Sequence, residues 1–261
     1  MKKWIFILCF SLFTIFSFSQ SKPIVFNSTI KYDSVKDKEG NSYKTVRIGN
    51  QIWMAENLRS FFYRNGDIIK GEYTSIIEMM KNKSSDQKTE DLPYNPDEES
   101  AFQGEEEQLP PYLQPEYVNT YGVLYTYDEV MSEQGICPIG WHIPSMPEWN
   151  TLIQYLGGPD LAAVKLKETG TSHWMNISNA TNSSGFTALP SGFINEDEVM
   201  QNRNTGITSV GYKTSWWSSE IKPSLIESES SNYAMAVHIN NFNNKLYTRI
   251  STKFPVRCIK N

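Results

Sequence analysis

The stretch Cys137-Pro-Ile-Gly-Trp-His-Ile-Pro-Ser-Met-Pro-Glu-Trp149 brings a rigid loop, a helix start and a cysteine together, and the rest of the chain is interpreted around it. Ser145 and Glu148 have the spacing of a capping box, in which each side chain binds the backbone N–H of the other residue. A helix is therefore expected to begin at Met146. Apolar residues at helical spacing continue it as far as Gly157-Gly-Pro159, which ends it.

Periodic patterns elsewhere indicate an α+β protein with short antiparallel sheets and two to three helices in the middle of the chain. Residues 42–55 have the alternation of a β-hairpin, with Gly49-Asn50 as the turn. Helical patterns at 127–132 and 160–169 accompany the helix that begins at Met146. Short strands are expected afterwards, at 186–189, 213–218, 233–239, 246–250 and 254–259.

The first residues have the pattern of a secretory signal. Lys2 and Lys3 precede the apolar run 5–18, and Ser17-Phe-Ser19 supplies the small residues of a cleavage site. The run is shorter than the ~20 residues that cross a bilayer, so residues 1–19 are expected to be a signal peptide rather than a membrane anchor. The protein is therefore expected to be secreted, periplasmic or at the cell surface, without a membrane span after processing.

Charge and cysteine content narrow the classes of partner. The formal net charge of −5 becomes more negative when Lys2 and Lys3 are removed, and an acidic protein is a poor partner for nucleic acid. Removal of the signal also takes away Cys9, which leaves Cys137 and Cys258 as an even pair in an oxidising compartment. We expect these two cysteines to form one disulfide, with two buried free thiols as the alternative.

The remaining chain is interpreted as one domain, residues 41–261, preceded by a loose lead-in at 20–40. Residues 61–118 carry acidic clusters and prolines, which are typical of a solvated insertion. Residues 64–115 are accordingly expected to be dispensable for folding. A calcium site there is the alternative, but the Asp/Asn pattern and central Gly of an EF-hand loop are missing. We therefore expect no metal or other cofactor.

Six short motifs occur in order along the chain: Val46-Arg-Ile-Gly-Asn-Gln-Ile-Trp-Met-Ala-Glu-Asn-Leu58, Tyr121-Gly-Val-Leu-Tyr-Thr-Tyr127, the Cys137 to Trp149 stretch, Ser184-Gly-Phe-Thr-Ala-Leu-Pro190, Trp217-Ser-Ser-Glu220 and Val256-Arg-Cys258. Together they resemble the Fibrobacter succinogenes major paralogous domain, found in proteins from Bacteroidetes and Fibrobacteres. The resemblance implies secretion and a role at the cell surface. Strands at both ends, helices between them and a cysteine placed to join the last strand also resemble the C-type-lectin-like fold and the related sulfatase-modifying domain.

Residue patterns for catalysis are sparse. His142, His173 and His238 lie in dissimilar contexts, and no Gly-x-Ser-x-Gly motif accompanies them. Sulfatase-modifying enzymes use a close cysteine pair near the C-terminus, whereas this chain has only Cys258 there. A glycoside hydrolase with paired carboxylates stays open as an alternative, because the separation of two carboxylates is a three-dimensional quantity. The leading expectation is a protein that is not an enzyme.

The stretch Trp216-Trp-Ser-Ser-Glu220 is the leading candidate for ligand binding. Adjacent strand residues point to opposite faces, so one of Trp216 and Trp217 is expected to be buried and the other to face outward as a platform for a sugar ring. Two core tryptophans are the alternative. The loop with Trp141 and His142 is a second candidate, although His142 also suits a packed structural role. We expect a binding or adhesion module for carbohydrate, with a structural surface or matrix protein that binds protein partners as the alternative.

Overall fold

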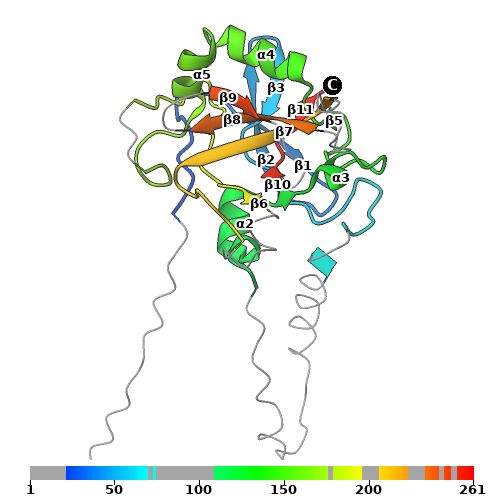
Figure 1. Cartoon of the computed structure of the whole chain (residues 1–261). Helices are drawn as coiled ribbons and strands as arrows, with labels where there is room; N and C mark the ends of the chain where they lie inside the picture. Colours follow the sequence, from blue (N-terminus) through cyan, green and yellow to red (C-terminus); the bar gives the residue numbers. More distant parts are fainter. Residues whose placement is uncertain are drawn as a thin grey trace, which may run out of the picture.

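The structure is a computed structural model that describes residues 22–69, 73–74, 109–175, 179–195, 206–222, 233–240, 244–247 and 252–261. The expected signal peptide, Cys9 and the centre of the acidic stretch lie outside these residues. The described chain forms a mixed α+β fold (Figure 1). Its helical elements are a 3₁₀ turn η2 (Pro111–Leu113), α2 (Pro115–Tyr121), α3 (Tyr127–Val130), α4 (Met146–Tyr155) and α5 (Pro159–Leu166). None of these helices is long and apolar enough to cross a bilayer.

Three small antiparallel sheets hold the strands. The five-stranded sheet has the order β1 (Asp33–Lys36), β2 (Ser42–Ile48), β3 (Gln51–Met54), β11 (Ile259–Lys260) and β5 (Trp141–His142). A second sheet orders β4 (Leu124–Tyr125), β10 (Thr252–Pro255) and β6 (Ile194–Asn195). The third orders β7 (Lys213–Lys222), β8 (Tyr233–Asn240) and β9 (Asn244–Tyr247). The last strand, β11, thus lies between the N-terminal hairpin and β5, which brings segments far apart in sequence into one sheet.

The locally encoded elements form where the sequence predicts them. In the β2–β3 hairpin, Ile48 pairs with Gln51 across the Gly49-Asn50 turn. Helix α4 begins at Met146, the Ser145 hydroxyl accepts the Glu148 N–H (3.4 Å), and the Glu148 carboxylate accepts the Ser145 N–H (2.8 Å). The capping box is therefore confirmed.

The described residues form four α-helices, α2 to α5, where two to three were expected, because α2 forms at the end of the expected insertion. Helix α3 begins with a second capping box, formed by Thr126 and Glu129, which was not predicted. Helix α5 ends at Leu166, because Lys167 is extended and bridges to Ala188 instead. The strand expected at 186–189 is an irregular loop apart from this single parallel bridge.

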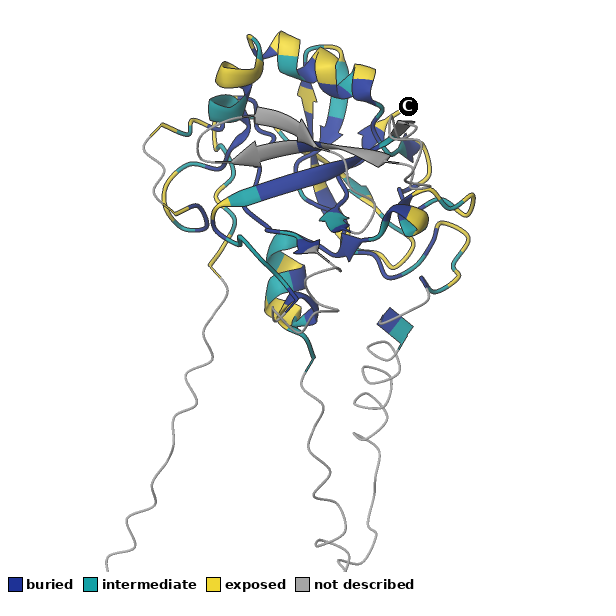
Figure 2. Cartoon of the chain, in the orientation of Figure 1, coloured by how far each residue is buried: buried dark blue, intermediate teal, exposed yellow. Residues whose placement is uncertain are grey.

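Strand β7 lies between two hydrophobic cores. Trp217 belongs to one core with Leu124, Tyr125 and the disulfide, whereas Trp216 belongs to the other with Trp149. The exposed fractions of Trp216 and Trp217 are 0% and 1%, and Figure 2 shows the strand as buried along most of its length. The expectation that one indole faces outward is wrong, because both faces of this strand are covered. The alternative of two core tryptophans holds.

The segments on either side of the hairpin are more ordered than their composition suggested. The expected lead-in contributes strand β1, and Phe26, Ile30 and Tyr32 pack against the second core. Both ends of the expected insertion reach the first core through buried side chains: Phe61, Tyr63, Ile69, Tyr73, Tyr112, Leu113 and Val118. The expectation of a solvated insertion is wrong at these ends, because apolar anchors flank the charged stretch. That residues 64–115 are dispensable for folding stays a prediction.

Cys137 and Cys258 form a disulfide with a Cα–Cα distance of 6.0 Å, as expected. Both residues are buried in the first core, and the bridge ties the loop before β5 to the residues before β11. The bond closes a sequence separation of 121 residues, so it restricts the unfolded chain strongly.

Removing this bridge should lower the free energy of unfolding by about 2–5 kcal/mol. Cys137→Ala and Cys258→Ala should each show the full loss, and the double variant should lose little more, because either single change removes the same bond. Urea unfolding of the three variants measures this. Additive losses would show that the two side chains act through packing instead of through the bridge.

Candidate functional site

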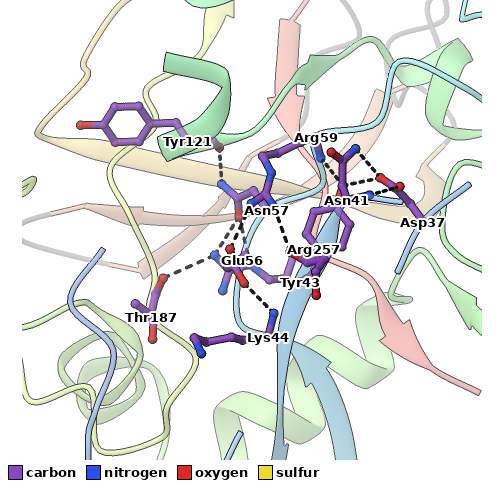
Figure 3. A network of polar contacts seen from close by, with 11 residues as sticks. Asp37, Asn41, Tyr43, Lys44, Glu56, Asn57, Arg59, Tyr121, Thr187 and Arg257 are labelled. Atoms are coloured by element: carbon purple, nitrogen blue, oxygen red, sulfur yellow. Dashed lines mark hydrogen bonds and ion pairs between the residues drawn. The ribbon is translucent and has the colours of Figure 1, made fainter. Parts of the chain in front are cut away.

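A buried polar network centred on Asn57 joins the end of β3 to the C-terminal segment (Figure 3). The Asn57 side-chain oxygen accepts hydrogen bonds from Arg257 Nε (3.0 Å) and Nη2 (2.8 Å). The same oxygen accepts the indole N–H of Trp216 at 2.8 Å. One amide oxygen therefore accepts hydrogen bonds from both a cation and an indole of strand β7.

Arg257 is 1% exposed, and backbone carbonyls and aromatic rings complete its surroundings. Its guanidinium donates to the carbonyls of Phe186 and Thr187 and lies 4.2 Å from the ring centroid of Phe186. Burial lowers the pKa of Arg257 to about 9, although the charge of Glu56 opposes the shift. The side chain therefore stays a cation at neutral pH while buried.

The side-chain amide nitrogen of Asn57 positions the end of helix α2. Asn57 Nδ2 donates to the carbonyl of Tyr121 at 2.7 Å, and Figure 3 shows the Tyr121 ring directed away from the network. The next residue, Gly122, has φ of +84°. A Cβ on Gly122 would come within 2.7 Å of Asn57 Cβ, so glycine is required where the helix ends against this residue. The buried network thus fixes the backbone that carries Tyr121.

Tyr121 lines a cavity of about 570 Å³ that we call the tyrosine groove. Its wall includes Tyr117, Thr120, Tyr121, Ser172, His173 and Met175. Tyr117 and Tyr121 lie one helical turn apart on α2, so their rings share a face of the helix and their centroids are 5.0 Å apart. The volume lies within the range of small-molecule sites.

Hydroxyl groups and aromatic rings supply much of the groove wall, and Lys22 and Glu116 add one charge of each sign. The Tyr117 hydroxyl donates to the carbonyl of Ser191 at 2.5 Å, which fixes that ring. Burial and the charge of Glu168 raise the pKa of Tyr121 to about 12. The Tyr121 hydroxyl is therefore protonated at neutral pH and can both donate and accept.

A buried histidine–carboxylate pair, His173 and Glu168, forms part of the groove wall and the layer behind it. His173 Nδ1 lies 2.7 Å from a carboxylate oxygen of Glu168, a residue with 0% exposure. The other Glu168 oxygen accepts the Val25 N–H at 2.6 Å, and His173 Nε2 lies 3.1 Å from the Lys22 carbonyl. Because a carbonyl only accepts, Nε2 carries a proton. Both imidazole nitrogens are thus bonded to protein groups, and the pair holds the N-terminal segment against the groove.

The residues expected to bind ligand lie elsewhere and serve the fold. Trp141 is buried in the first core. His142 bridges Asn261 (2.7 Å) and Glu148 (2.9 Å). Partial burial raises the pKa of Glu148, but hydrogen bonds from Ser145 and His142 outweigh this effect and lower the pKa below its usual value.

Glu220, from the leading candidate stretch, accepts the Met146 N–H at 3.2 Å. His142, Glu148 and Glu220 therefore meet at the start of α4, where they satisfy the helix terminus. The side chain of His238 lies outside the described part of the chain. In that described part, no group of three or more His, Cys, Asp or Glu side chains is placed to hold a metal ion.

Fold and site together define a disulfide-linked α+β domain with a buried arginine network and an aromatic groove at its surface. The chain belongs to the Fibrobacter succinogenes major domain family, whose model matches residues 46–260. Comparison with curated proteins and with solved structures finds no match. The family match begins within β2, so the N-terminal segment that carries Lys22 precedes it.

Replacing Asn57 by Ala should lower the free energy of unfolding by at least about 3 kcal/mol, because it leaves a buried cation and an indole N–H without their acceptor. Asn57→Asp is the matched variant. It keeps an oxygen for Arg257 and Trp216 and adds a charge that pairs with the guanidinium, and it replaces the donor to the Tyr121 carbonyl by an oxygen, so it should cost less. Chemical denaturation of both variants tests the ranking, and a loss below about 1 kcal/mol in Asn57→Ala would contradict it.

Proposed function

We propose that the protein is an exported, non-catalytic binding module that takes a carbohydrate ligand in the tyrosine groove. The observation that carries the proposal is a set of unpaired hydroxyls beside two tyrosine rings. Within the described residues, the hydroxyls of Thr120, Tyr121 and Ser172 form no hydrogen bond with the protein, and all three line the same cavity. A sugar offers complementary hydroxyls and C–H faces, which suit hydroxyl and aromatic groups respectively.

A C-type-lectin-like fold is the architecture we propose for this module. The pairing of the N-terminal hairpin with the last strand supports it, as do the helices between these strands and the Cys137–Cys258 bridge. Binding through the groove requires no metal ion in this proposal, because tyrosine, threonine and serine hydroxyls supply the polar contacts. Secretion or surface display is proposed from the N-terminal signal pattern.

A structural role with a protein partner is the second candidate, and the rim of the groove favours it. Met175 lines the cavity and is 51% exposed, and it bonds through its backbone to Gly211. The next residue, Tyr212, is 45% exposed. Exposed methionine and tyrosine are common in protein interfaces. An enzyme is the least supported reading, because the histidine in the groove has both nitrogens bonded to protein groups.

The proposal is tested by a glycan array on the exported protein, followed by calorimetric titration of the oligosaccharide that binds. Thr120→Val and Ser172→Ala remove unpaired hydroxyls and should weaken binding about tenfold each, with little change in melting temperature. Tyr121→Ala should abolish binding, because it removes both the ring and its hydroxyl.

Tyr212→Ala is the matched control, since this tyrosine is exposed but does not line the cavity. Tyr212→Ala should leave sugar binding unchanged. It should weaken the binding of a protein partner only if that partner contacts the rim of the groove. Equal loss in Tyr121→Ala and Tyr212→Ala, or undiminished sugar binding in Thr120→Val, would remove the groove as the carbohydrate site.

A further inference from the structure

A second cavity, of about 280 Å³, lies beside the disulfide loop. We call it the cationic cavity, because its lining includes three basic side chains beside apolar ones: Lys36, Lys38, Arg64, Phe62, Ile136 and Ile139. It shares no lining residue with the tyrosine groove. A concentration of positive charge at one place is unexpected in a chain with a net charge of −5.

The guanidinium of Arg64 is held in place by the backbone. Arg64 Nε donates to the carbonyl of Cys137 at 3.0 Å, and Nη2 donates to the carbonyl of Trp141 at 3.1 Å. The Arg64 N–H donates to the Gly135 carbonyl at 2.7 Å. Gly135 has φ of +68°, and a Cβ on it would lie 3.2 Å from Arg64 Cζ. Glycine therefore lets the planar group lie close to the chain, and its position is set before any ligand arrives.

Neutral carbonyls position this cation without cancelling its charge. Within the described residues, neither Arg64 nor the exposed Lys36 and Lys38 forms an ion pair. Arg64 Nη1 also has no hydrogen-bond acceptor among these residues. The Nη1 nitrogen of the guanidinium and two flexible ammonium groups are thus left for a ligand.

The nearby carboxylates are committed to the protein itself. Asp37 also lines the cavity, but its oxygens accept hydrogen bonds from the Asn41 side chain (2.9 Å) and the Tyr43 hydroxyl (2.5 Å), as Figure 3 shows in part. Glu39 accepts the Ser60 hydroxyl (2.6 Å) and the Phe61 N–H (2.8 Å). Three cations face one lining carboxylate, so the cavity keeps a positive potential.

We propose that the cationic cavity binds the carboxylate of an acidic saccharide. Arg64 and the two lysines would take the carboxylate, and the apolar wall would take a C–H face of the ring. Ile139 is 83% exposed, which leaves a large apolar surface at the cavity mouth for that contact. Ligand pockets have volumes from about 300 Å³ upward, and this cavity lies near that lower end. Its volume therefore suits one monosaccharide unit better than a longer chain.

The test uses trigalacturonic acid and its neutral methyl ester as probes, titrated calorimetrically into the exported protein at low ionic strength. The acid should bind, the ester should bind at least about tenfold more weakly, and the affinity for the acid should fall as salt is added. The exposed pair is changed in Lys36→Gln/Lys38→Gln, which should weaken binding of the acid about tenfold or more without unfolding the protein.

A double variant with the same change in charge, Lys31→Gln/Arg47→Gln, is the matched control, because neither exposed residue lines the cavity. Equal losses in the two double variants, equal affinities for acid and ester, or no binding of the acid at millimolar concentration would overturn the proposal. Tighter binding of hexaglutamate than of trigalacturonic acid would also overturn it and assign an acidic peptide. Tyr121→Ala should leave binding of the acid unchanged, so this site and the tyrosine groove can fail separately.

Discussion

The burial of the Arg257 guanidinium is the constraint on which the rest of the structure depends. Removing a cation from water costs several kcal/mol unless its donors find acceptors. Here the acceptors are the Asn57 amide oxygen and the carbonyls of Phe186 and Thr187, while the Phe186 ring faces the charge. These groups come from segments far apart in the chain, so the cation can be buried only when all of them are in place. Folding of these segments is therefore coupled.

Two short series of contacts link the buried guanidinium to other parts of the structure, one through Thr187 and one through Asn57. Thr187 has φ of +55°, which is costly for a β-branched residue, and the Asn182 side chain holds it through its N–H and hydroxyl. The strained loop presents its carbonyl to Arg257. On the other side, Asn57 binds the Tyr121 carbonyl, and that backbone carries a ring of the tyrosine groove. The groove is thus shaped by the core, because Asn57 holds the backbone at the end of α2 while the Thr120 and Tyr121 hydroxyls keep no hydrogen bond among the described residues.

The sequence predicted the elements whose signals are local and missed those that depend on what covers them. The Ser145–Glu148 capping box lies within one helical turn, and the Cys137–Cys258 bridge was predicted from a count of cysteines in a chain expected to be exported. Strand alternation placed Trp216 and Trp217 on opposite faces, but it cannot show that a second core covers the second face. A solvated insertion was predicted from the charged residues around Tyr73, although Tyr73 itself is buried in the first core. The tyrosine groove was missed because its wall is drawn from four separate segments, and only the i, i+4 pair of tyrosines on α2 was visible beforehand.

Both cavities combine residues of the family domain with residues that precede it. Arg64 and Tyr121 fall within the matched range 46–260, whereas Lys22, Lys36 and Lys38 come before it. The preceding segment is tied to the domain by β1 and by the Glu168 carboxylate, which accepts the Val25 N–H. The backbone that carries its lysines is therefore held beside the cavities. The family domain provides the scaffold and the fixed aromatic and guanidinium groups, and a segment outside the matched range adds charge to the walls. The charge of the two cavities is for that reason not set by the family domain alone, and a shared fold does not determine it.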